Sequence, residues 1–154
     1  MESLPTSFLI LGSFLAFTLL WIAIIWLIGS LGGWAKIAEK YPARQPWSAT
    51  CWHMQSAQLR GFANYSGILK ICADAEGIHV ATIIFFSMGH APFSVPWVEI
   101  NGRQRRRFLI NDVELRFQRI PHIPMSISPA LANRLVAASG GAWRYEEVET
   151  NKKM

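Results

Sequence analysis

Residues 8–28 of the chain read FLILGSFLAFTLLWIAIIWLI, and no charged side chain occurs between Ser3 and Ala35. About 20 consecutive apolar residues suffice to cross the ~30 Å hydrocarbon core of a bilayer as a helix. The stretch therefore predicts one membrane-spanning helix from Leu4 to Leu31, within a first segment of residues 1–33. The rest of the chain is then expected to fold beside a membrane.

A cleaved signal peptide and a buried core helix both fit this stretch less well than a membrane span. A signal peptide would have a basic segment before an apolar core of roughly 7–15 residues. Here Glu2 is the only charged side chain before a longer core. A buried core helix would need a partner able to cover it on every side, and the roughly 120 remaining residues are too few for that.

The charges that flank the stretch predict its orientation. Lys36, Lys40 and Arg44 follow it closely, and no Lys or Arg precedes it. Cytoplasmic flanks carry the excess of Lys and Arg. We therefore expect a single-pass protein of the inner (plasma) membrane, with its N-terminus outside and its C-terminal domain in the cytoplasm. Cys51 and Cys72 would then be reduced thiols.

The part of the chain after the apolar stretch is basic. All fifteen Lys and Arg residues and nine of the ten acidic residues lie after residue 31, so that part carries a net charge of +6. A basic domain beside a membrane is attracted to anionic lipid. Nucleic acid also attracts positive charge, but a membrane tether argues against it. The length is that of one compact domain.

A short amphipathic segment, residues 34–46, follows the predicted span. The residues that recur at helical spacing on one face are Trp34, Ile37, Ala38 and Tyr41. Trp and Tyr favour the membrane–water interface, and Lys36 and Lys40 can extend to lipid headgroups. The pattern indicates a short helix that lies at the membrane interface through Trp34, Lys36, Lys40 and Tyr41, or one that folds back on the domain.

Small residues within the span suggest contacts with a second helix. Gly12 and Ala16 lie one turn apart, as do Gly29 and Gly33. Such spacing lets two helices approach closely, although glycine is common in membrane helices in any case. Either pair could pack against the helix of an integral membrane complex.

Residues 47–140 have the pattern of short antiparallel strands followed by one helix. Apolar and polar residues alternate in residues 113–118, which predicts a half-buried strand with Val113, Leu115 and Phe117 facing the core. Asn101-Gly102 is a strong signal for a hairpin turn. Ser128-Pro129 has the form of a helix N-terminus. Residues 141–154 are expected to be a mobile tail, apart from Trp143 and Tyr145.

This order resembles a PH-like or GRAM-like split barrel of six to seven strands closed by a C-terminal helix. The segment FSVPWVEI, residues 93–100, resembles a strand common in bacterial domains of this kind, and so does the turn DAEG at residues 74–77. The whole chain resembles small bacterial single-span membrane proteins that carry such a domain. The phosphoinositide-binding motif of soluble PH domains is not cleanly present.

One dense cluster of positive charge occurs after the span, at RQRRR, residues 103–107. Guanidinium groups suit phosphate and carboxylate, so Arg103, Arg105, Arg106 and Arg107 are candidates for contact with anionic lipid or an acidic partner. The alternative is a solvated hairpin flank that protects a sheet edge.

The function expected from these features is non-catalytic. The usual spacings of nucleophile, nucleotide and zinc-protease motifs are absent from the sequence. Isolated Cys and His residues give no metal-ligand pattern, so no cofactor or metal is expected. We expect a binding module for a protein or anionic lipid at the membrane surface. The alternative is an accessory subunit of a larger integral membrane complex, packed through its single helix.

Overall fold

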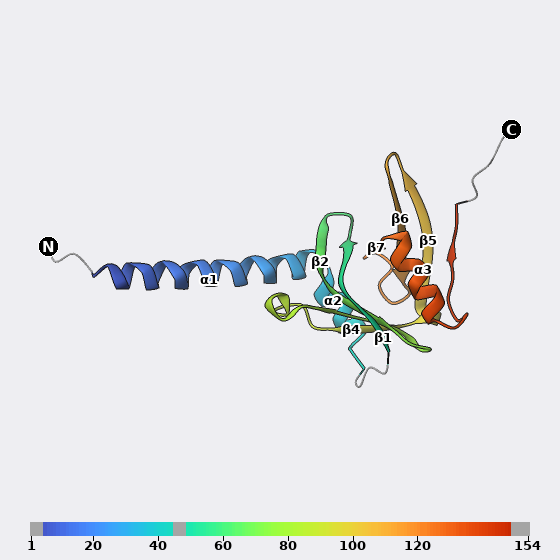
Figure 1. Cartoon of the computed structure of the whole chain (residues 1–154), viewed down its shortest axis with the longest axis horizontal. Helices are drawn as coiled ribbons and strands as arrows, with labels where there is room; N and C mark the ends of the chain where they lie inside the picture. The colour runs from blue at the N-terminus through green and yellow to red at the C-terminus, as the bar shows by residue number, and fades with distance from the viewer. Residues whose placement is uncertain (1–4, 45–48, 149–154) are drawn as a thin grey trace.

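The computed structural model of the chain describes residues 5–44 and 49–148 (Figure 1). Its first helix, α1, runs from Thr6 to Leu31 and projects from the rest of the molecule as a rod. Its 26 residues correspond to a length of about 39 Å. Its most apolar window has a mean hydropathy of 2.6. The described part of the chain thus contains one helix that is long and apolar enough to cross a membrane.

The remaining elements form a mainly-β domain. Its helices are α2 (Trp34–Lys40) and α3 (Pro129–Ala138), with short 3-10 turns η1 (Ile84–Phe86) and η2 (Trp97–Glu99). Its strands are β1 (Thr50–Leu59), β2 (Ala63–Ala73), β3 (Gly77–Thr82), β4 (Phe93–Pro96), β5 (Ile100–Arg107), β6 (Ile110–Phe117), β7 (Met125–Ile127) and β8 (Tyr145–Glu146).

The eight strands form one curled sheet, a half-barrel, in the order β4-β3-β2-β1-β7-β6-β5-β8. All neighbours are antiparallel except β5 and β8, which are parallel. The predicted class is confirmed to this extent: an apolar N-terminal helix, a mainly-β domain and a C-terminal helix. The sheet has one strand more than the upper end of the expected range.

The core lies inside the curl of the sheet. The alternation predicted for β6 is confirmed, because Val113, Leu115 and Phe117 are each at most 1% exposed. Helix α3 buries Leu131 and Leu135 against the sheet. The predicted start of this helix is also confirmed. The Ser128 hydroxyl accepts a hydrogen bond from the Leu131 amide at 3.2 Å, and Pro129 is the first helical residue.

The hairpin predicted at Asn101-Gly102 is wrong. Both residues lie within β5, and the chain turns instead at Phe108 and Leu109, between β5 and β6. Gly102 is required for packing rather than for a turn. A Cβ atom at this position would lie 2.5 Å from the Trp143 ring, closer than side chains can approach.

The two aromatic residues excepted from the expected mobile tail, Trp143 and Tyr145, belong to the folded domain. Trp143 is 4% exposed, and its indole N–H donates to the Ile100 carbonyl at 3.0 Å. After it, β8 pairs with β5. The folded domain therefore extends to at least Glu146, because Trp143 completes the core beside Trp97. The last residues of the expected tail, 149–154, lie outside the described part.

The expectation of reduced cysteines is contradicted as well. Cys51 and Cys72 form a disulfide. They lie directly opposite each other on the antiparallel strands β1 and β2, which brings the two side chains together. Sequence spacing alone did not reveal this pairing, since the register of the two strands was unknown.

Helix α1 is packed against the domain through its last turns. Ile25 is 4% exposed and Gly29 is buried, whereas most earlier large apolar residues of α1 are exposed. Cβ atoms at Gly29 and Gly32 would lie within 3 Å of His90 and Ala63 respectively. The base of α1 is thus in van der Waals contact with the domain.

Candidate functional site

The cluster of arginines predicted as a contact surface is located on β5. Strand alternation places Arg103 and Arg105 on one face and Arg106 on the other. Arg103 and Arg106 are exposed, and the Arg107 side chain lies outside the described part of the structure. The structure therefore does not gather the described arginines into one patch.

Arg105 is engaged within the domain. Its guanidinium forms ion pairs with Glu114 and, at 3.5 Å, with Asp112 on β6. Arg116 Nε pairs with the other carboxylate oxygen of Glu114 at 2.6 Å. Glu114 is only 4% exposed, and a buried carboxylate requires such partners. We infer that Arg105 holds the β5–β6 pair together rather than binding an external ligand.

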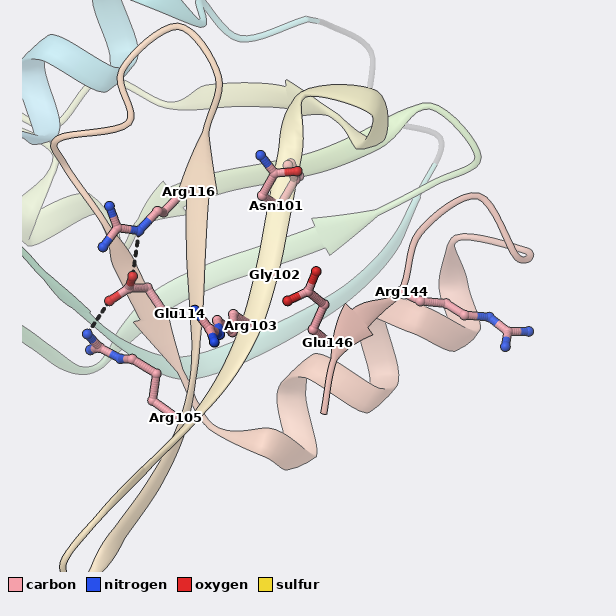
Figure 2. Close-up of a pocket in the computed structure, with 9 residues that line it drawn as sticks. Asn101, Gly102, Arg103, Arg105, Glu114, Arg116, Arg144 and Glu146 are labelled. Atoms are coloured by element: carbon pink, nitrogen blue, oxygen red, sulfur yellow. Dashed lines mark hydrogen bonds and ion pairs between the residues drawn. The ribbon is translucent and has the colours of Figure 1, made fainter. Parts of the chain in front are cut away.

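A cleft of about 480 Å³ lies beside this ion network (Figure 2). Its lining residues are Ile100, Asn101, Gly102, Arg103, Arg105, Glu114, Arg116, Arg144 and Glu146. Figure 2 shows Glu114 between Arg105 and Arg116, and Arg144 extending outward from the segment before β8. Four arginines against two glutamates give the lining an excess of positive charge. Such a lining suits an anionic group such as a carboxylate.

The tip of the β5–β6 hairpin is apolar and exposed. Phe108 is completely exposed, Leu109 is 88% exposed and Ile110 is 65% exposed. Figure 1 shows the hairpin projecting from the domain across the direction of α1. Sequence reasoning missed this surface because an apolar run next to arginines also fits a strand that enters a core.

Two of the residues predicted to lie at the membrane interface are buried. Trp34 is 1% and Tyr41 2% exposed. The Trp34 ring packs on Tyr65, His90 and Phe93. The prediction that Trp34 and Tyr41 contact the membrane is therefore wrong, and the alternative, that the segment folds back on the domain, is confirmed. Lys36 and Lys40 are exposed, and their role at a membrane stays a prediction.

The end of α2 is held by a charged cluster. The Tyr41 hydroxyl donates to Glu99 at 2.8 Å, and Arg119 forms a two-pronged ion pair with the same carboxylate. Hydrogen bonds from Arg119 and Tyr41 lower the pKa of Glu99. Burial raises the pKa of Tyr41, so its hydroxyl stays a donor at neutral pH. This cluster explains why the segment after α1 has a defined position.

The two small-residue pairs of α1 have different surroundings. Gly29 packs on Gly89 and His90, and Gly33, with a φ of +89°, lies against Ile123. The expectation that this pair receives a partner helix is therefore wrong, since both residues contact the chain's own domain. A Cβ atom at Gly12 would meet nothing within 4 Å, and Ala16 is exposed. That pair stays a candidate for packing with another helix.

The described residues contain no cluster of three or more His, Cys, Asp or Glu side chains that could hold a metal ion.

No protein-family model matches the chain, and no curated protein matches it. The class that the fold defines is a β half-barrel domain attached to one long apolar helix.

Proposed function

We propose that the protein is a non-catalytic binding module, anchored in a membrane by α1, whose β5–β6 hairpin contacts a partner protein. The observation that carries this proposal is the hairpin tip. Phe108, Leu109 and Ile110 form a contiguous apolar surface in water. Apolar surface of this kind marks interaction sites.

The anchoring role of α1 is supported by its contacts. Removal of the helix as a signal peptide would take away Ile25 and Gly29, which are buried in the folded molecule. It would also expose His90, which packs on Gly29. The exposed remainder of α1 presents apolar side chains on every side, which suits lipid. The Ser13 and Thr18 hydroxyls donate to carbonyls of their own helix.

The geometry of the hairpin favours a protein over a lipid headgroup as its partner. If α1 crosses the membrane, a hairpin that projects across the direction of α1 extends along the membrane surface rather than toward it (Figure 1). Its flanks present the exposed Arg103 and Arg106 beside the apolar tip. Aromatic residues, Phe included, and Arg are enriched in protein interfaces. A partner with an acidic rim around an apolar pocket fits this surface.

We also propose that the half-barrel is a PH-like split barrel. This assignment is supported by the order of the elements, because antiparallel strands β1–β7 are followed by the single helix α3. Domains of this general architecture carry many functions. The resemblance therefore bears on the fold alone, and the proposed function rests on the hairpin surface.

Native gel electrophoresis of gently solubilised native membranes tests the proposal. We expect the wild-type chain to migrate within a larger complex, and the double variant Phe108→Asp with Leu109→Asp to migrate at lower mass. Val98→Asp is the matched control, because Val98 is 81% exposed and lies outside the hairpin. Equal migration of the hairpin and control variants would contradict the proposal.

A second candidate function is that of an accessory subunit held through α1. The observation that favours it is the open face at Gly12 and Ala16. Replacing both residues by Leu should leave insertion intact, since Leu is favourable in the membrane. Loss of the complex in this variant, with the complex retained in the hairpin variant, would favour this alternative.

A further inference from the structure

A second exposed apolar surface lies in the loop between β3 and β4. Ile84 is 79% exposed, Phe85 78% and Met88 54%. No charged side chain occurs in residues 80–92 apart from the titratable His90, which is buried. Soluble proteins rarely expose contiguous apolar patches, so this composition indicates a surface that contacts a membrane or a partner.

The loop extends along α1. At its base, a Cβ atom on Gly29 would touch the Gly89 carbonyl and the His90 ring, and Gly89 itself lies against Trp26. Further along, the Phe86 ring lies 5.8 Å from the Trp21 ring. Gly29 and Trp21 are eight residues apart, or about 12 Å along the helix axis. Figure 1 shows η1 beside the end of α1, on the side of the domain from which the helix emerges.

Part of the loop backbone is hydrogen-bonded within the loop. The Phe86 amide donates to the Ile83 carbonyl at 2.9 Å, and the Ser87 amide donates to Ile84 at 3.2 Å. The Ser87 hydroxyl also donates to the Ile84 carbonyl, at 2.7 Å. Within a bilayer, polar backbone groups need internal partners because lipid provides none. The 3-10 turn supplies such partners for the Phe86 and Ser87 amides, while the Ile84 and Phe85 side chains are exposed.

We propose that residues 83–88 insert into the membrane beside α1, so that the domain contacts the bilayer at two places. This inference rests on the proposed role of α1 as a membrane span. Tryptophan favours the interfacial region of a membrane. The loop contacts Trp21 and Trp26 of α1, so it lies at the depth of these two residues. The contact is apolar, and it therefore does not depend on the headgroup charge.

Photo-crosslinking in the full-length protein tests the insertion. A benzophenone amino acid is placed singly at Phe85, at Phe14 or at Phe108, and each protein is reconstituted in phosphatidylcholine vesicles with or without phosphatidylglycerol. Phe14 lies within the exposed part of α1, and Phe108 is the exposed hairpin tip. After irradiation, mass spectrometry measures lipid adducts.

We expect lipid adducts from positions 85 and 14, in both kinds of vesicle, and none from position 108. Adducts from position 14 without adducts from position 85 would overturn the insertion while leaving the span in place. Adducts from position 85 only in anionic vesicles would also overturn it, because the loop carries no positive charge. A lack of adducts at position 14 would overturn both the span and the insertion.

Discussion

The indole N–H of Trp34 donates a hydrogen bond to the Ala91 carbonyl at a distance of 2.8 Å. The two residues lie 57 positions apart in the sequence, so this bond joins the segment after α1 to the loop before β4. The same ring packs on Tyr65, His90 and Phe93, and His90 also lies against Gly29 of α1. One aromatic cluster therefore joins α2 to the domain and touches the base of α1.

Replacing Trp34 by Ala should strongly destabilise the domain. Truncation of a buried Trp typically costs about 3–5 kcal/mol, a large part of the ~5–15 kcal/mol stability of a small domain. Thermal unfolding in detergent, followed by circular dichroism, measures the effect. Ala35→Gly is a control of similar position, because Ala35 is exposed in the same helix. Equal melting temperatures of the wild type and Trp34→Ala would contradict the conclusion that the Trp34 ring is part of the core.

The same substitution at two glycines of α1 should have different effects. A Cβ atom at Gly29 would lie 2.9 Å from the Gly89 carbonyl oxygen, whereas one at Gly12 would meet nothing within 4 Å. We therefore expect Gly29→Ala to lower the melting temperature of the full-length protein and Gly12→Ala to leave it unchanged. Equal melting temperatures for the two variants would mean that α1 does not pack on the domain through Gly29.

The domain should lose stability as the pH falls through the range of histidine titration. Burial lowers the pKa of His90, which is 3% exposed, below its usual value. Its Nδ1 lies 3.2 Å from the Met88 carbonyl, so Nδ1 carries the proton and Nε2 accepts from the Tyr65 hydroxyl at 3.1 Å. The neutral ring satisfies both contacts.

The sign of this dependence follows from proton linkage. Between the folded pKa and the unfolded value of about 6.5, the unfolded chain binds the additional proton, so the free energy of unfolding decreases as the pH falls. Urea unfolding at about pH 7.5 and about pH 5.5 measures it, and His90→Gln should show a smaller decrease than wild type. An equal decrease in both proteins would assign the pH dependence to other groups.

The Cys51–Cys72 disulfide and the flanking charges predict opposite orientations. Lys36 and Lys40 predict a cytoplasmic domain, whereas disulfides persist in oxidising compartments. The disulfide is part of the folded sheet, and we therefore expect the domain to face the oxidising side. A thiol-reactive polymer added to solubilised, denatured membranes should label the protein only after reduction.

A variant with Cys72→Ser is the control for that measurement, because its single thiol must react without a reductant. Labelling of the wild-type protein before reduction would show free thiols. That result would favour the cytoplasmic orientation that the lysines predict.

The sequence predicted those structural features that depend only on neighbouring residues. The alternation at Val113, Leu115 and Phe117 identified the buried face of β6, and Ser128-Pro129 identified the start of α3. Such patterns depend on residues a few positions apart, and those residues are visible in the sequence.

Contacts between distant segments were not predictable in the same way. Helical spacing placed Trp34 and Tyr41 on one face, but it could not tell whether that face covers a membrane or the chain's own core. Gly102 resembled a turn residue, but a glycine is required there because the Trp143 ring packs against it. Trp143 lies far along the chain, so the sequence did not reveal this contact. For the candidate site, the sequence located the arginines of β5, but not the Glu114 carboxylate that engages Arg105.

The central claim is that α1 stays in the mature protein as its membrane anchor. The intact mass of the protein purified from membranes, after they have been washed with alkaline carbonate, tests this claim most directly. We predict that the protein stays in the washed membranes and that its mass includes the α1 residues Thr6–Leu31. A mature chain that begins after Leu31 and is released by the wash would contradict the account.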